Sequence, residues 1–320
     1  MALIRYRWLA PLLALALLAA CGQNHDGAAS GHASATPAKS VLSSIHLLQK
    51  GQFDALLQQL LPPAEYRRMR AFWTARHARL GQASARDRAR FARAMAELTA
   101  PDANQRIWSR IQAKLRQMDP QTRARLPLMI GMGQLMLSTR ISQADQLSPD
   151  QKQQAGDVLE AVGSWAQKTD WTDQDRIRRV VGVVTATARK LDLGTLDQVA
   201  ALDYAQAMRK YAVVWSGLKQ ALDVYGLSLD QTLDSVTART LQSDAHTATV
   251  RVDYTLLGKP QHLTVDMIRI DNHWYDKDLL DHWRKALQRA APAPAVSAAA
   301  AAGKPAPPVS APRPPVAHRG

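Results

Sequence analysis

Cysteine is almost absent from this chain, because only one residue, Cys21, occurs among 320. A disulfide within the chain needs two cysteines, and structural zinc sites built on thiolates use several. Both kinds of covalent or metal stabilisation are therefore excluded. With 46% apolar residues the composition is that of a globular chain, so the fold must rest on buried apolar side chains.

Recognisable catalytic motifs are also missing. The chain has no Gly-x-Ser-x-Gly segment, which would present a nucleophilic serine, and no glycine-rich loop of the kind that surrounds phosphates. Two pairs of acids, Asp170 with Asp173 and Asp276 with Asp278, have the residue types of a glycosidase site. Both pairs occur where helices are expected to begin, and carboxylates there stabilise the helix dipole. We therefore assign no catalytic residue and expect a non-enzymatic protein.

The first twenty-one residues combine a basic start with an apolar run. Arg5 and Arg7 precede the apolar segment from Trp8 to Ala20. This segment is short for a membrane span, since a transmembrane helix needs about 20 apolar residues. A basic start, a short apolar core and small residues before the cut are typical of a secretory signal peptide. We expect residues 1–20 to be removed on export.

The end of this segment, Leu18-Ala19-Ala20-Cys21, resembles the lipobox of bacterial lipoproteins. The resemblance implies cleavage before Cys21, a thioether bond from its thiol to diacylglycerol, and acylation of the new amine by a chain such as palmitate. Two or three acyl chains anchor a protein durably, because each buried methylene contributes about 0.8 kcal/mol. Gly22 stands where an aspartate favours inner-membrane retention, which implies an outer-membrane lipoprotein facing the periplasm. The alternative is an ordinary signal followed by a free thiol.

Two segments of biased composition flank the expected domain. Residues 21–39 are mostly small, polar and aperiodic, which indicates a flexible tether between the lipid and the domain. Residues 290–320 are a mixture of Ala and Pro with scattered Lys and Arg, a composition that cannot bury a core. We expect this tail to be disordered and to act as a spacer. The alternative is a docking segment for a groove or for the cell wall.

Positive charge is concentrated in one part of the chain. Between Arg67 and Arg125 there are fifteen Lys or Arg residues and four acids, a net charge of +11 out of +14 for the whole sequence. In two expected helices the cations recur every three or four residues beside an apolar stripe, so both helices are amphipathic. These cations are Arg86, Arg90, Arg93, Arg106, Arg110 and Lys114.

Such a basic face on an exported protein attracts anions. We expect its partner to be an anionic envelope component or an acidic periplasmic protein, in addition to the membrane lipid held through Cys21. Nucleic acid, the usual partner of such charge in the cytoplasm, is not expected because of the export signal. The alternative is that these side chains only solvate the helix surfaces.

Capping motifs and glycines predict where the helices of the remaining helical region begin and end. Ser148 to Gln151 has the sequence of a capping box, and Thr172 to Asp175 is a close variant. The longest helix is expected from Thr195 to Tyr225, with an apolar seam at spacings of four and three. The seam residues are Tyr204, Met208, Tyr211, Trp215, Leu218, Leu222 and Tyr225. We expect this seam to pack in the core, and the alternative is a site for a hydrophobic ligand.

After Leu233 the hydrophobic period changes from 3.6 to 2, which predicts an antiparallel meander. A first strand is expected from about Leu233 to Gln242, and a two-residue turn at Gly258-Lys259 sets the register of the next two strands. The apolar side shifts after Met267, which predicts a bulge there. The expected pairs are Leu257 with Pro260, Tyr254 with Leu263, Val252 with Val265, Val250 with Met267 and Arg251 with Asp266.

The end of the meander carries a second resemblance. A helical run that leads into a curved meander ending in Ile270-Asp271-Asn272-His273-Trp274-Tyr275 looks like the cone-shaped domains similar to nuclear transport factor two. The resemblance covers at most Leu196 to Trp283. Some members of that superfamily are enzymes and many only bind, so no catalytic residue follows from it. A ligand-binding member would have a deep pocket, for which the candidate residues are Val252, Tyr254, Val265 and Trp274.

The same end of the sheet holds the closest approach to a metal site. His246 is expected opposite Asp271, with His273 just beyond the turn. These residues lie near loops and lack a recognisable ligand spacing. We therefore assign no metal ligand and no cofactor.

The predicted fold class is α+β and mostly α, with a multi-helix body, a small curved antiparallel meander and a closing helix from Leu279 to Arg289. The expected organisation is a signal peptide (1–20), lipidated Cys21 and tether (21–39), a helical region (40–193), a long helix with meander and C-terminal helix (194–289), and a tail (290–320). The expected function is a non-enzymatic envelope interaction module that acts through its basic helices. The alternatives are an immunity or inhibitor lipoprotein against a secreted toxin, and a small-ligand-binding lipoprotein.

Overall fold

The computed structural model of the chain describes residues 36–145 and 147–290. The expected signal peptide, Cys21, most of the expected tether and the Ala/Pro-rich tail from residue 291 lie outside these residues. The first described helix, α2, begins at Pro37, where the hydroxyl of Thr36 accepts a hydrogen bond from the amide of Lys39. The end of the stretch expected as tether is therefore helical.

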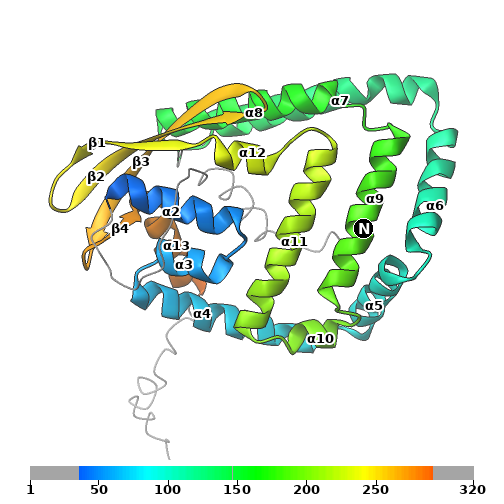
Figure 1. Cartoon of the computed structure of the whole chain (residues 1–320), viewed down its shortest axis with the longest axis horizontal. Helices are drawn as coiled ribbons and strands as arrows, with labels where there is room; N and C mark the ends of the chain where they lie inside the picture. Colours follow the sequence, from blue (N-terminus) through cyan, green and yellow to red (C-terminus); the bar gives the residue numbers. More distant parts are fainter. Residues whose placement is uncertain (1–35, 146, 291–320) are drawn as a thin grey trace, which may run out of the picture.

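Helices predominate, and a four-stranded sheet lies at one end of the molecule (Figure 1). The described helices are α2 (Pro37–Gln49), α3 (Phe53–Leu60), α4 (Pro63–Ala78), the 3-10 helix η1 (Arg79–Gln82), α5 (Ala85–Thr99), α6 (Ala103–Gln117), α7 (Pro120–Ser142), α8 (Pro149–Lys168), α9 (Gln174–Leu191), α10 (Leu196–Ala200), α11 (Tyr204–Val224), α12 (Leu229–Asp234) and α13 (Lys277–Ala290). The strands are β1 (Thr237–Ser243), β2 (Thr247–Leu256), β3 (Lys259–Ile270) and β4 (His273–Asp276). The predicted fold class, an α+β chain that is mostly α, is confirmed.

Side-chain caps explain several helix boundaries. Ser148 forms the predicted capping box with Gln151 at the start of α8. At α9 the cap is Asp173 rather than Thr172, because its carboxylate accepts hydrogen bonds from two amides of the first turn. The expected single helix from Thr195 to Tyr225 is wrong: Asp203 and Gln206 form a further capping box that begins α11 separately from α10.

The sheet is an antiparallel meander in the order β1-β2-β3-β4, but its central register differs from the predicted one by two residues. Val252 pairs with Leu263, whereas the prediction paired it with Val265. Leu257 and Gly258 form the turn, and both have positive φ (54° and 78°), as a type I′ turn requires. The prediction placed glycine first in the turn and so set the register wrongly. A shift of two residues keeps each side chain on its predicted face.

The register change also replaces the expected cross-strand pair of Arg251 with Asp266. Arg251 lies opposite Thr264 and donates instead to Asp253 on its own strand, with Nε 2.8 Å from Oδ1. Asp266 lies opposite Thr249, whose hydroxyl is 3.0 Å from its carboxylate. Both polar pairs lie on the less buried face of β2, opposite the face that carries Val250 and Val252.

Two further expectations about the strands are corrected. β1 begins at Thr237, because Leu233 belongs to α12. The bulge lies in β1 between Thr240 and Gln242, whereas β3 pairs with β2 without interruption past Met267. The apolar side changes along β3 because Ile270, near its end, packs against a second hydrophobic cluster between α4, α11 and α13.

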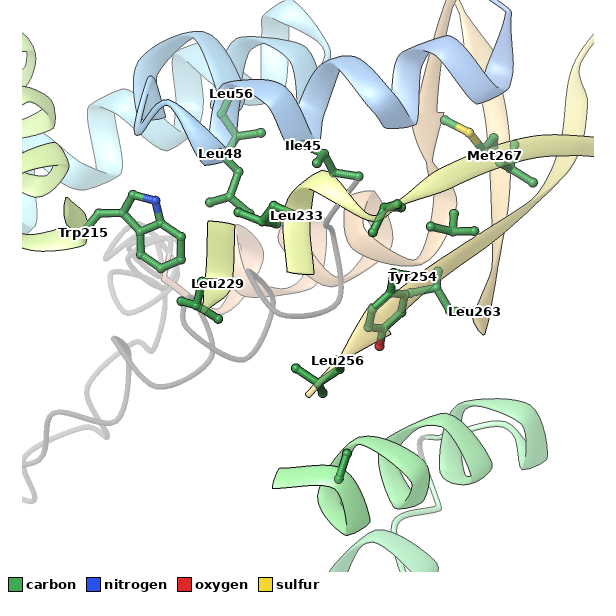
Figure 2. Close-up of a cluster of buried hydrophobic side chains, with 14 of the residues drawn as sticks. Ile45, Leu48, Leu56, Trp215, Leu229, Leu233, Tyr254, Leu256, Leu263 and Met267 are labelled. Atoms are coloured by element: carbon green, nitrogen blue, oxygen red, sulfur yellow. The ribbon is translucent and has the colours of Figure 1, made fainter. Parts of the chain in front are cut away.

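The main core joins the first helices to the sheet (Figure 2). Ile45 and Leu48 of α2 and Leu56 of α3 are buried together with Trp215 and with Val250 in the middle of β2. Fully burying a side chain of this size contributes about 1.5 to 3 kcal/mol. The core is thus shared between residues 40–193 and 194–289, which were expected to form successive regions.

Helices α5, α6, α9 and α10 lie away from the sheet, whereas α8 packs against β3 (Figure 1). In Figure 1 α4, α5, α6 and α7 follow one another along the lower, right and upper edges of the molecule, and α9 and α11 lie inside them. α9 packs against α5, α6 and α11, and α7 packs against α8. Within the described ranges, no helix is both long and apolar enough to cross a membrane.

Candidate functional site

The structure places all six predicted cations on the exposed surface of α5 and α6. Arg86, Arg90 and Arg93 follow one another at spacings of four and three residues, which puts them on one face of α5. Arg106, Arg110 and Lys114 recur every four residues and therefore lie on one face of α6. The apolar stripes of both helices point inward, where Met95 and Leu115 are buried, and both helices pack against α9.

An ion pair connects the two cationic stripes. The guanidinium of Arg110 on α6 contacts the carboxylate of Glu97 on α5. Glu97 lies four residues after Arg93 and therefore continues the α5 stripe. The two stripes meet at this contact and form one surface, which we call the α5–α6 cationic face. The sequence predicted each stripe but did not predict this contact between them.

Acidic neighbours neutralise only part of this face. Arg106 pairs with Asp102, with Nε 3.1 Å from Oδ2, and Arg110 pairs with Glu97. Within the described part of the chain the other four cations form no ion pair; they are Arg86, Arg90, Arg93 and Lys114.

The remaining acids of this region, Asp87 and Asp119, accept hydrogen bonds at the N-termini of α5 and α7. The hydroxyl of Ser84 donates to Asp87 at the start of α5, over 2.7 Å. Asp119 caps α7, and hydrogen bonds from the Thr122 hydroxyl and from the amides of Thr122 and Gln121 lower the pKa of its carboxyl. Asp119 therefore stays ionised while bound to its own helix. The region keeps an excess of positive charge at neutral pH.

The predicted pocket residues belong mainly to the core. Val252, Tyr254 and Trp274 are each 6% exposed or less. Val252, Val265 and Trp274 line a cavity of about 50 Å³ between the sheet and α2, and Tyr254 does not line it. Drug-sized ligands need cavities of roughly 300 Å³ or more. The sheet face is thus filled by α2, and the four residues act as packing residues.

A partly buried carboxyl, that of Asp276, lies in the wall of this small cavity. Burial raises the pKa of Asp276 to about 6. Its Oδ1 accepts a hydrogen bond of 2.8 Å from the amide of Leu279 and so stabilises the start of α13. The hydroxyl of Ser40, on α2, faces the same cavity and has no hydrogen-bond partner among the described residues. Sequence analysis recognised Asp276 as an acid at a helix start but did not predict its burial.

The apolar seam of α11 divides between the two hydrophobic clusters. Trp215 belongs to the main core, and Tyr204 belongs to the cluster between α4, α11 and α13. Arg70 on α4 lies over the ring of Tyr204, 4.7 Å from its centre, and Trp73 meets the same ring edge-on at 5.2 Å. Burial raises the pKa of the Tyr204 hydroxyl well above its usual value. Trp215 and Tyr204 are packing residues as expected, but Tyr211 of the same seam is 41% exposed, so the expectation is wrong for that residue.

The expectation that the chain holds no Ser-x-x-Lys motif is wrong, because Ser216 and Lys219 have this spacing on α11. The ammonium of Lys219 lies 2.5 Å from the carboxylate of Asp230 and 3.0 Å from the carbonyl of Gln49. These contacts join Lys219 of α11 to α2 and α12, so this side chain has a structural role in the packing of the three helices.

A second hollow lies where α9, α10 and α11 meet. It is an open groove of about 600 Å³, lined on its polar side by Lys190, Arg209 and Lys210 together with Asp192. The ammonium of Lys210 donates to the carbonyl of Leu191 over 2.5 Å and so closes the end of α9. The break between α10 and α11 creates this groove, so the expectation of one continuous helix could not reveal it.

The possible metal ligands do not form a site. Across residues 36–145 and 147–290, no three His, Cys, Asp or Glu side chains are placed to hold a metal ion together. Asp271 forms the turn between β3 and β4 with Asn272, and both have positive φ. The carbonyl of His246 accepts a hydrogen bond of 2.8 Å from the amide of Arg269. These residues thus close the end of the sheet.

Comparisons of the chain with protein-family models, with curated proteins and with solved structures find no match. The α5–α6 cationic face is the strongest candidate, because it combines exposure, regular spacing and an excess of one charge.

Proposed function

We propose that this protein is an outer-membrane lipoprotein, anchored through Cys21, whose α5–α6 cationic face binds an anionic surface of the envelope. The observation that carries the proposal is the exposure of six cations on two neighbouring helices, of which only two have an acidic partner in the described structure. Lipid headgroups and acidic proteins are both anionic surfaces that such a face recognises.

The expected binding free energy follows from the number of cations without an acidic partner. Each Lys or Arg near an anionic membrane surface contributes about 1 kcal/mol at physiological salt. Four unpaired cations therefore provide about 4 kcal/mol, or about a thousandfold in binding constant. This is weak for a free protein, but an acyl anchor raises the effective concentration of the domain at the surface. The face is thus suited to orienting or retaining a protein that is already tethered.

A chain from Gly22 to Gly320 allows the test, because it lacks the expected lipid but keeps every described residue. Its binding to vesicles of phosphatidylglycerol and phosphatidylcholine is compared before and after all six cations are replaced by glutamine. The proposal predicts at least a tenfold loss of binding to the anionic vesicles or loss of periplasmic partners in a pulldown. Unchanged binding in both assays contradicts it. A secreted enzyme retained by the six-glutamine variant would favour the inhibitor alternative.

A further inference from the structure

Helix α7 exposes an unusual row of apolar side chains. Five residues of this helix, each between 61% and 71% exposed, are Leu128, Met129, Met132, Leu135 and Met136. No residue of α7 is buried. Proteins rarely expose a contiguous set of large apolar side chains on one helix unless that face contacts something else. We call these five residues the α7 apolar row.

The row points away from the rest of the protein. The opposite side of α7 packs against α8, where the carbonyl oxygen of Gln134 accepts a hydrogen bond of 2.7 Å from Gln167. Leu126, Ile130 and Ile141 are partly buried, and with Gln134 they recur at spacings of four, four and seven residues. At 100° per residue the α7 apolar row is centred on the opposite face of the helix. Figure 1 shows α7 along an outer edge of the molecule.

An arginine stands at each end of the row. Arg125 precedes Met129 by four residues, and Arg140 follows Met136 by four, so both lie close to the same face. Both are exposed. α7 contains no Asp or Glu, and residues 103–142 contain seven Lys or Arg and one acid, the cap Asp119. The apolar row is therefore set in a strongly basic surrounding.

We propose that α7 is a membrane-contact helix that lies flat on an anionic phospholipid bilayer. The α7 apolar row enters the boundary between headgroups and acyl chains, while Arg125 and Arg140 bind lipid phosphates. An exposed apolar face with basic flanks is the composition of interfacial helices, and long arginine side chains reach the headgroups from such a position. The inference rests on the proposed function, because it names the anionic surface as phospholipid.

The charges around the α7 apolar row favour a lipid bilayer over a second copy of the protein or another protein partner. In an antiparallel pairing of two α7 helices centred between Met132 and Gly133, Arg125 of one copy faces Arg140 of the other. In a parallel pairing each arginine faces the same arginine of the second copy. No acid of α7 offsets either repulsion. A protein partner needs an apolar strip with carboxylates about 22 Å apart to match both arginines. An anionic bilayer offers hydrocarbon and phosphates everywhere along the helix.

The location of α7 supports the same assignment. α6 ends at Gln117 and α7 begins at Pro120, so a helix of the α5–α6 cationic face is followed directly by the helix with the apolar row. Figure 1 shows α6 and α7 meeting at one corner of the molecule. Electrostatic attraction by the cations brings the domain to the anionic surface, and the apolar row then holds it by entering the lipid.

The test uses the full lipidated chain, reconstituted into vesicles, with an environment-sensitive fluorophore on M132C. The unsubstituted chain is labelled in parallel, so that any free thiol at Cys21 is measured and subtracted. L241C is the matched control, because Leu241 on β1 is 51% exposed and lies outside the row. We expect a blue shift and quenching by lipid-embedded quenchers at position 132 in phosphatidylglycerol vesicles, and no change at position 241.

A second variant, L128S/M132S/L135S/M136S, separates insertion from charge. Because these side chains are exposed, the variant keeps the wild-type thermal transition, and V184S/V214S/L241S is its control with other exposed apolar residues. In the chain from Gly22 to Gly320 we expect at least a tenfold loss of binding to anionic vesicles for the first variant and less than a threefold change for the control.

Several results overturn the inference. If cation-dependent vesicle binding persists while position 132 stays in water, the inference is wrong and the proposed function stands. If no variant binds vesicles but an acidic protein is retained through the six cations, the same conclusion follows. Shielding of position 132 that depends on protein concentration without lipid would show a second copy on α7. If the proposed function itself is wrong, the six-glutamine variant binds vesicles and periplasmic partners as the wild type does, and this result distinguishes the two failures.

Discussion

Arg284 on α13 donates two hydrogen bonds to Oε1 of Glu65 on α4, from Nε over 3.0 Å and from Nη2 over 2.9 Å. The Glu65 side chain is only 11% exposed. The pair joins the last described helix to a helix near the start of the domain, beside the hydrophobic cluster that contains Leu280. The closing helix is thus held by one polar contact in addition to its apolar face.

Removing the carboxylate of this pair leaves a guanidinium that is 38% exposed. We expect E65Q to lower the free energy of unfolding by about 1 kcal/mol, since partial exposure lets water solvate the arginine. Urea unfolding monitored by tryptophan fluorescence measures the change. D281N, which breaks the exposed pair of Asp281 with Lys277, is the control and is expected to cost less than about 0.5 kcal/mol. Equal losses in the two variants contradict the ranking.

The stability of the protein should depend on the protonation of Asp276. Burial raises the pKa of Asp276 to about 6, whereas an aspartate in an unfolded chain titrates near 3.9. Below pH about 4 both states hold the proton, and between about 4 and 6 the unfolded state releases it first. This carboxyl therefore lowers the free energy of unfolding as pH rises, by at most about 3 kcal/mol at pH 7.

D276N removes this titration and keeps an oxygen that accepts the hydrogen bond from Leu279. The difference in unfolding free energy between D276N and wild type should shift in favour of the variant as pH rises from 4 to 7. Urea titrations at several pH values measure the difference. A difference that is independent of pH would show that Asp276 has the same pKa in both states.

The turn between β2 and β3 depends on backbone conformation at Gly258. Its φ is +78°, and a Cβ added there meets no atom within 4 Å. G258A should therefore cost about 1 to 2 kcal/mol through backbone strain alone. The matched control is G156A on α8, where a Cβ also meets nothing but the backbone is helical, so the variant should gain up to about 1 kcal/mol. A neutral G258A would contradict the observed turn.

Sequence patterns predicted the local structure where one signal dominates. The capping box of Ser148 and the alternation of β2 specify their elements because each depends on residues close in sequence. The prediction was wrong where two signals compete. The seam from Tyr204 to Tyr225 hid the capping box at Asp203, and the preference of glycine for positive φ hid the fact that Leu257 adopts it too.

In the α5–α6 cationic face, too, the sequence predicted what depends on local spacing and missed what depends on packing between helices. The spacing of Arg86, Arg90 and Arg93 was enough to predict one exposed face of α5. The contact of Arg110 with Glu97 depends on how α5 and α6 pack, which helical periodicity does not specify. The exposure of the apolar residues of α7 does not follow from the sequence, because an apolar stripe on a core helix and one on a membrane-contact helix have the same period.

The most direct test of the proposed function compares two variants with equal net charge in the chain from Gly22 to Gly320. The first replaces the four unpaired cations of the α5–α6 face by glutamine: R86Q/R90Q/R93Q/K114Q. The second replaces four exposed cations elsewhere: K50Q/R209Q/R239Q/K285Q. Binding to phosphatidylglycerol vesicles and to acidic periplasmic proteins is measured at low and physiological salt.

We predict that the first variant loses about a thousandfold in binding at physiological salt and more at low salt, and that the second variant changes less than threefold. Such a result assigns binding to the α5–α6 cationic face. Equal losses in the two variants would show that only the overall charge matters, and no loss in either would show that the face is solvated and does not bind.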